Sequence, residues 1–195
     1  PTRRSSDLYL DEARDIKPPV VRLKTWWGSY RRDVCIHGHF NMNVGVGIET
    51  YYPEVEQFVT WLRDPVELQI SLFHHHMKLN GAARYNQEGA IRTTTDIDEF
   101  FEKSRSPYFK EFPRRVTPEN LFEQVEGRFI HIGVLEQLDA SMQNIAAKLG
   151  RKVTGTHHEN TTKRSHGPSE SAIRRFQEKS ALEYKLYEYA CGLNR

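Results

Sequence analysis

The segment 57–71 constrains the fold of this chain more strongly than any other. Its first six residues are mostly apolar and rich in β-branched and aromatic side chains, which predicts a short interior strand. Asp64 then stands where the N-cap of a helix belongs, Pro65 follows at the first helical position, and Glu67 comes three residues after the cap. A strand that turns directly into a helix predicts an α/β protein.

The same junction is a candidate anion-binding site. Free backbone N–H groups at a helix N-terminus and the helix dipole both attract negative charge. Arg63 adds a guanidinium at the end of the strand, and Ser71 can add a hydroxyl two turns into the helix. One interpretation is phosphate recognition by these two side chains. The alternative is an ordinary strand-to-helix corner with a surface arginine and a serine bonded to its own helix.

A second motif, His37-Gly38-His39, follows another short apolar segment. In extended backbone, residues i and i+2 share a face, so the two imidazoles would point the same way. A neutral histidine at the end of a strand can accept a proton from a hydroxyl near pH 7. Paired histidines are as often metal ligands or polar surface residues, so the motif alone leaves these alternatives open.

Taken together, the two motifs resemble those of the carbohydrate sulfotransferases, in particular the heparan sulfate and uronosyl 2-O-sulfotransferases and their bacterial relatives. The resemblance lies in His37-Gly38-His39, followed by a strand that runs into Arg63-Asp64-Pro65-Val66-Glu67, with Ser71 eight residues after Arg63. It continues in Phe129–Asp139, which is similar to the family's late strand and following helix, and in the C-terminal stretch Leu182–Ala190.

The resemblance implies a P-loop-NTPase-like fold, in which a mostly parallel sheet is flanked by helices. It implies that Arg63 and Ser71 bind the 3′-phosphate of the sulfate donor, 3′-phosphoadenosine-5′-phosphosulfate. Lys163 and Arg164 lie where the family's donor-covering loop is expected. The resemblance therefore assigns all four side chains to the nucleotide co-substrate.

The same resemblance implies the roles of the two histidines. His39 matches the general base that deprotonates the acceptor hydroxyl, and His37 matches a supporting histidine beside it. The reaction is an in-line transfer of a sulfuryl group, for which positioning and charge stabilisation matter most. The implied partner is a sugar or glycan acceptor, with an anionic glycan among the candidates.

One element of the family pattern is missing before His37, namely a strand and a Lys-containing, Gly/Thr-rich loop for the 5′-phosphosulfate. The segment Lys24–Ser29 is a poor substitute, because only thirteen positions separate Lys24 from His37 and a parallel crossover takes about a dozen or more residues.

Residues 1–8 resemble the translation of a sequencing adapter and are expected to be a non-native leader. Residues 9–195 are then expected to form a single domain, incomplete at its N-terminus and without the phosphosulfate-loop strand. The alternative function is a catalytically incomplete nucleotide-binding fragment or pseudoenzyme that retains only the 3′-phosphate half-site.

A run of three histidines, His74-His75-His76, suggests metal binding as a third hypothesis, a histidine-based metallohydrolase. Successive helical residues point about 100° apart, so the three cannot face one ion. A combination of His37 and His39 with one of these histidines is geometrically possible. Arg63, which is expected at the same end of the sheet, would however repel a cation. We therefore predict no metal site.

Residues 81–118 form a turn-rich insertion that we expect to face the acceptor. Its basic side chains could recognise an anionic sugar, since guanidinium groups pair with carboxylate or sulfate; they are Arg84, Arg92, Lys103, Arg105, Lys110, Arg114 and Arg115. The alternative is a solvated loop whose charges are partly offset by acidic neighbours, namely Asp96, Asp98, Glu99, Glu102 and Glu111.

The remaining expectations are general. A formal net charge of +2 over 195 residues gives no indication of nucleic-acid binding, and no apolar run is long enough to span a membrane. The oligomeric state and the location are not readable, although a bacterial protein of this kind would be cytoplasmic. Predicted strands are 33–36, 57–62 and 128–134. Predicted helices are 65–79, 96–104, 135–149 and 170–191, the last bent near Ser180.

Overall fold

The structure, a computed structural model, describes residues 40, 47–87, 90–153 and 167–194. The chain divides into two compact units. The first comprises Pro1–Val55 with Phe109–Arg115, and the second comprises Glu56–Tyr108 with Val116–Arg195. Within the described part of the first unit, the short helix α2 (Ile48–Tyr51) carries Glu49, whose carboxylate pairs with Arg114 Nε at 2.8 Å.

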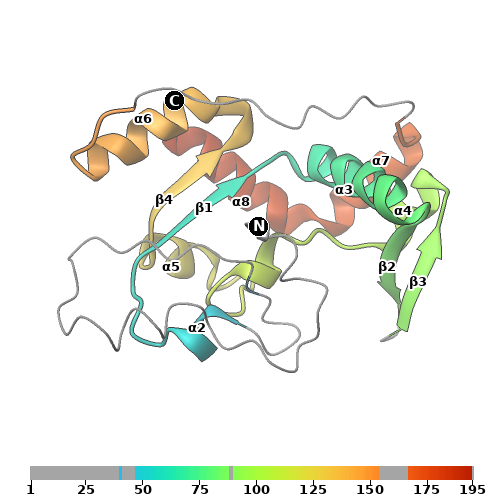
Figure 1. Ribbon diagram of the computed structural model, residues 1–195, viewed down its shortest axis with the longest axis horizontal. Helices are drawn as coiled ribbons and strands as arrows, with labels where there is room; N and C mark the ends of the chain where they lie inside the picture. The colour runs from blue at the N-terminus through green and yellow to red at the C-terminus, as the bar shows by residue number, and fades with distance from the viewer. Residues whose placement is uncertain (1–39, 41–46, 88–89, 154–166, 195) are drawn as a thin grey trace, which may run out of the picture. The chain divides into compact units, whose positions relative to one another are not determined.

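The second unit contains a parallel pair of strands, β1 (Phe58–Leu62) and β4 (Phe129–Val134) (Figure 1). Leu62 is in register with Val134, so the two strands end at the same edge. Both strands lie within one residue of the predicted bounds, and the chain is confirmed as a mixed α/β protein.

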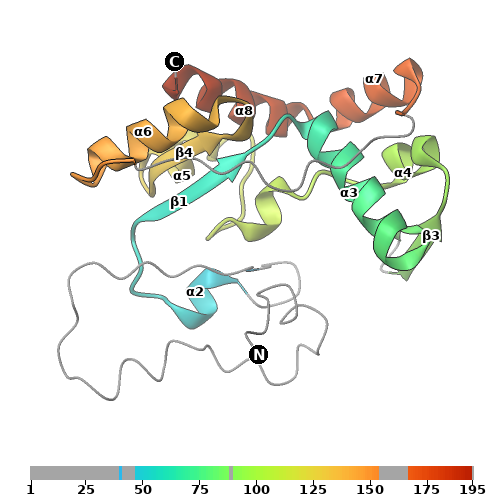
Figure 2. The same ribbon diagram turned by 45° about the horizontal axis from the view of Figure 1, so that its top comes forward.

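The helices α6 (Leu138–Lys148) and α8 (Ala181–Leu193) pack against β4 (Figures 1 and 2). Three side chains from this region bond to alternate residues of the strand. Lys148 Nζ donates to Ile130 O, Asn194 Nδ2 donates to Ile132 O, and Val134 N–H donates to Ser141 Oγ, at 2.8, 2.8 and 2.9 Å respectively. The backbone groups of alternate residues in a strand point to the same side. These bonds therefore satisfy backbone N–H and C=O groups on the border of β4 that faces away from β1.

The other half of this unit is built on α3 (Pro65–Asn80), which ends at Gly81 in the left-handed conformation with φ 69°. A hairpin of β2 (Ala83–Gln87) and β3 (Ala90–Thr94) follows, then α4 (Ile97–Lys103), and α7 (Glu170–Lys179) packs against α4. Buried side chains from α3, β2, α4 and α7 form one core, namely Ile70, Phe73, Ala83, Tyr85, Ile97, Phe100, Phe101, Ala172 and Phe176.

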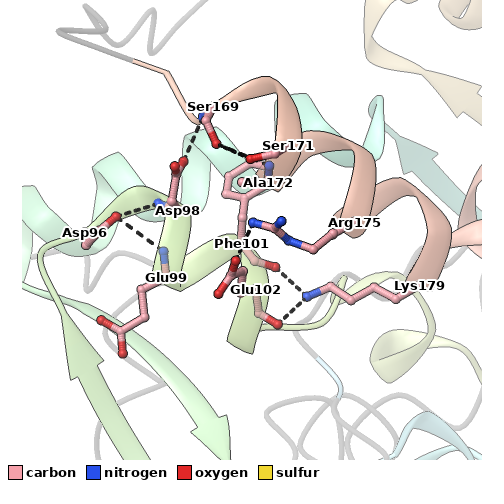
Figure 3. Close-up of polar contacts among 10 residues, drawn as sticks. All are labelled: Asp96, Asp98, Glu99, Phe101, Glu102, Ser169, Ser171, Ala172, Arg175 and Lys179. Carbon is pink, nitrogen blue, oxygen red and sulfur yellow. Dashed lines mark hydrogen bonds and ion pairs between the residues drawn. The ribbon is translucent and has the colours of Figure 1, made fainter.

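A row of polar contacts joins α4 to α7 (Figure 3). Asp98 accepts a hydrogen bond from Ser169 N–H at 2.7 Å, at the start of α7, and Glu102 forms an ion pair with Arg175. Lys179 Nζ donates to the backbone carbonyls of Phe101 and Glu102, the latter at 2.8 Å, near the C-terminus of α4. Burial lowers the pKa of Lys179 to about 8.

Most of the predicted helices are confirmed. α3 and α4 lie within one residue of the predicted bounds, and the predicted bend near Ser180 is the boundary between α7 and α8. The helix predicted from 135 begins as a 3₁₀ turn, Leu135–Gln137, before α6. The hairpin, α2 and α5 (Leu121–Glu126) were not predicted, and the strand predicted at 33–36 lies outside the described residues. Of the helices that the structure describes, none has the length and apolar character needed to cross a lipid bilayer.

We expect Gly133→Ala to lower the free energy of unfolding by about 1–3 kcal/mol, the usual cost of overpacking. A methyl group at Gly133 would lie 2.4 Å from Nε1 of Trp61, its register partner across the strand pair. Gly192→Ala is the matched control, because nothing lies within 4 Å of its added methyl group. Urea denaturation of both variants tests this packing, and equal stability of Gly133→Ala and wild type would contradict it.

We expect Asp98→Asn to lower the free energy of unfolding at pH 7 by about 0.5 kcal/mol, as for a carboxylate near a helix N-terminus. The hydrogen bond from Ser169 N–H lowers the pKa of Asp98 in the folded protein. A carboxyl group with a lowered pKa stabilises the fold above its unfolded pKa, and this contribution is lost as the pH falls through the folded pKa.

The difference in free energy of unfolding between wild type and Asp98→Asn, measured by urea titration, should therefore shrink below about pH 4. Glu178→Gln, on an exposed position of α7, controls for the loss of one charge. A difference that stays constant from pH 7 to pH 3 would exclude this assignment.

Candidate functional site

The predicted anion site lies where β1 and β4 end together. Arg63 follows the last residue of β1, and Glu136 follows the last residue of β4 by two positions. The Glu136 carboxylate accepts the Asp64 N–H at 3.1 Å and lies 3.9 Å from Arg63 Nε. The two strand-to-helix junctions are therefore tied to each other by one carboxylate.

The N-terminus of α3 is capped as the sequence predicts. Asp64 Oδ1 accepts the N–H groups of Val66 and Glu67 at 2.9 and 3.0 Å, and Pro65 occupies the first helical position. Side-chain carboxylates therefore accept the N–H groups of Asp64, Val66 and Glu67. An incoming anion at this helix end meets donors that already have partners.

Arg63 also forms an ion pair with Glu67, a residue in the first turn of α3. Its Nη2 atom lies 3.3 Å from Glu67 Oε2, four residues ahead. Ser71 is a further four residues along, half-buried, and residues four apart lie on the same helix face. Its position is about 9 Å beyond Pro65 along the helix axis, at a rise of about 1.5 Å per residue. The Glu67 side chain therefore emerges between the two residues predicted to bind one phosphate.

Two tyrosines, Tyr108 and Tyr187, lie close enough to the Glu136 carboxylate to feel its charge. Burial, together with the negative charge of Glu136, raises the pKa of Tyr187. Burial also raises the pKa of Tyr108, and the negative charges of Asp64 and Glu136 add to the rise. The backbone N–H of Arg63, which favours the phenolate, opposes this rise in pKa. Both phenols stay protonated at neutral pH, so they can donate hydrogen bonds at this edge.

The charge balance at the junction is negative. One guanidinium stands against the carboxylates of Asp64, Glu67 and Glu136. Two charges about 4 Å apart interact by about 4 kcal/mol at an effective dielectric constant near 20, so a phosphate brought to Arg63 would be repelled by the same carboxylates. The Arg63 side chain is 27% exposed, Glu67 36% and Glu136 37%, so water screens these interactions and the carboxylates can move away.

The structure brings together only part of the predicted site. Arg63 and Ser71 belong to one strand–helix unit. The other predicted residues, His37, His39, Lys163 and Arg164, lie outside the described residues. The convergence of Arg63 and His39 on one donor therefore stays a prediction.

The charged insertion 81–118 is distributed differently from the expectation of a single loop. Arg114 and Arg115 belong to the first unit, and the rest up to Tyr108 belongs to the second. Four of its acidic residues hold the fold together: Asp96 caps α4, Glu99 accepts hydrogen bonds from Tyr85 and Thr94, and Asp98 and Glu102 bind α7. The fifth, Glu111, pairs with a cation of the insertion, Lys110, at 3.7 Å, as the alternative expectation has it.

The histidine run has ordinary helical surroundings. His75 is exposed, and His76 Nδ1 accepts the Arg84 N–H at 3.2 Å, which links α3 to β2. In the part of the chain that the structure describes, no three His, Cys, Asp or Glu side chains are grouped so that they could hold a metal ion.

Sequence reasoning did not single out Glu136 as a neighbour of Arg63. The signal was present, because parallel strands end at one edge of a sheet and both residues come within two positions after a predicted strand. The pairing of strands 57–62 and 128–134 was the missing step, and the sequence does not specify which strands are neighbours.

Comparisons with protein-family models, with curated proteins and with solved structures found no match to this chain. Function is therefore inferred from the residues and their geometry.

Proposed function

We propose that this protein is a sulfotransferase, which moves a sulfuryl group from 3′-phosphoadenosine-5′-phosphosulfate to a hydroxyl of a carbohydrate acceptor. The observation that carries the proposal is the position of Arg63. It stands between the C-terminal end of a parallel strand and the capped N-terminus of a sixteen-residue helix, the part of an α/β fold where phosphate groups bind.

Arg63 and Ser71 are the proposed ligands of the donor's 3′-phosphate. A guanidinium can bind two phosphate oxygens at once, and a helix hydroxyl adds a further donor. For both to reach one phosphate, Glu67 must leave the space between them. Its pairing with Arg63 is a partly exposed i,i+4 ion pair, and helix pairs of this spacing are worth about 0.3–0.5 kcal/mol, so a phosphate can displace it at small cost.

His39 is the proposed general base. It takes the proton of the acceptor hydroxyl while the hydroxyl oxygen forms a bond to sulfur. The bond between sulfur and the oxygen of the 5′-phosphate breaks, and adenosine 3′,5′-bisphosphate leaves. His37 supports the base, and Lys163 and Arg164 are proposed to cover the donor. A P-loop-NTPase-like arrangement of the sheet belongs to the same proposal.

The second candidate is a nucleotide-binding fragment or pseudoenzyme that keeps only the 3′-phosphate half-site. It is favoured by one sequence observation, the absence of a Lys-containing, Gly/Thr-rich loop before His37. The two candidates differ in one measurement: both bind adenosine 3′,5′-bisphosphate through Arg63, and only the first transfers sulfate to a glycan.

We expect Arg63→Ala to weaken the binding of adenosine 3′,5′-bisphosphate by about tenfold or more, because hydrogen bonds to charged groups contribute about 1.5–3 kcal/mol. Isothermal titration calorimetry of the full chain measures this. Arg174→Ala, which removes an exposed arginine from α7, is the matched control and should bind as wild type does. Equal affinity in wild type and Arg63→Ala would remove Arg63 from the site.

We expect His39→Ala to reduce turnover by about 10²–10⁴-fold, the usual contribution of a general base, with little change in nucleotide affinity. Transfer of labelled sulfate to a panel of desulfated, uronic-acid-containing glycans measures turnover. His75→Ala replaces an exposed histidine of α3 and should leave turnover unchanged. A His39→Ala variant with wild-type turnover would contradict the assignment. Absence of transfer by wild type, together with Arg63-dependent nucleotide binding, would favour the second candidate.

A further inference from the structure

The guanidinium of Arg63 is held by two carboxylates that come from different parts of the chain. Glu67 lies one helical turn ahead, with Oε2 3.3 Å from Nη2. Glu136 lies after β4, with Oε1 3.9 Å from Nε, and the same oxygen accepts the Asp64 N–H at 3.1 Å. A single oxygen of Glu136 thus meets both an arginine and a backbone N–H at the start of α3, as a bound phosphate oxygen would.

We propose that Glu136 is an internal competitor of the anion, which occupies the Arg63 site until a nucleotide phosphate displaces it and so lowers the affinity of the site. Glu67 competes for the same guanidinium from its own helix. This inference rests on the proposed function, and it assigns Glu136 a regulatory, positioning role, not a role in the chemical step.

The surroundings of Glu136 allow such an exchange. Its side chain is 37% exposed, so the carboxylate can move into water without the penalty of a buried charge. Tyr187 lies beside it with a protonated hydroxyl that can donate a hydrogen bond to the carboxylate. The Glu136 carboxylate therefore has another partner when Arg63 turns to a phosphate.

The contact with Asp64 explains why a competing charge is placed here. The β1–α3 junction lies 72 positions from Glu136 in sequence, and the hydrogen bond to Asp64 N–H links that junction to the end of β4. With no anion present, Glu136 satisfies this N–H and partly neutralises Arg63. The cost of that arrangement is weaker anion binding.

The test is calorimetric titration of the full chain with adenosine 3′,5′-bisphosphate. Glu136→Gln should bind about two- to fivefold more tightly than wild type, because the glutamine oxygen still accepts the Asp64 N–H while the competing charge is gone. Glu123→Gln is the matched control. It makes the same change on an exposed position of α5, which precedes β4 and so belongs to the opposite end of that strand, and its affinity should equal that of wild type.

The gain in nucleotide affinity from Glu136→Gln must depend on Arg63. In the Arg63→Ala background, Glu136→Gln should no longer tighten binding, and a purely structural role for Glu136 would not produce this coupling. If Glu136→Gln fails to fold, Glu67→Gln replaces it as the test of competition, since a solvent-accessible helix position tolerates the change, and a tightening of about two- to threefold is expected.

The two possible failures are distinguishable. Arg63-dependent nucleotide binding in wild type, with equal or weaker affinity in Glu136→Gln, overturns the role of Glu136 and leaves the proposed function intact. No binding by wild type or by any variant overturns the proposed nucleotide site, and the role of Glu136 falls with it.

Discussion

The parallel pairing of β1 with β4 is the interaction on which the rest of the described second unit depends. The two strands are parallel, and Leu62, the last residue of β1, is in register with Val134, the last residue of β4. The residues that follow the two strands therefore emerge at the same edge of the sheet. Without that register, Arg63 and Glu136 would have no reason to meet. The close approach of the Trp61 indole to Gly133 reinforces the pairing, since only a residue without a side chain leaves room for the ring there.

At that edge, the protein balances two opposing demands. An arginine at the start of a helix binds anions best when its neighbours are neutral, whereas a stable corner needs its donors satisfied when no ligand is present. Here Asp64 caps the helix, and Glu67 and Glu136 hold the guanidinium. These carboxylates are partly exposed, so the arrangement stabilises the empty corner without closing it to a phosphate.

The local parts of this arrangement could be predicted from the sequence, and the long-range parts could not. Asp64 and Pro65 carry their own signal for a helix start, and the break at Ser180 fell where expected. The β2–β3 hairpin was missed because its signal is short: β2 buries only Ala83 and Tyr85 at alternate positions, and β3 shows no alternation, with Ile91 75% exposed. The contact of Glu136 with the β1–α3 junction needs the strand pairing, which no local pattern encodes. Arg63 and Ser71 were placed on the expected elements, while the four other predicted site residues lie outside the described residues.

The side chains that bond to β4 have a consequence for how the sheet can be enlarged. Lys148, Asn194 and Ser141 engage successive backbone groups along one border of that strand, so a newcomer docking there would have to break three bonds before it formed any. Addition of a further strand at this border, whether by folding or by association, would therefore forfeit contacts that hold α6 and the end of α8 against the sheet.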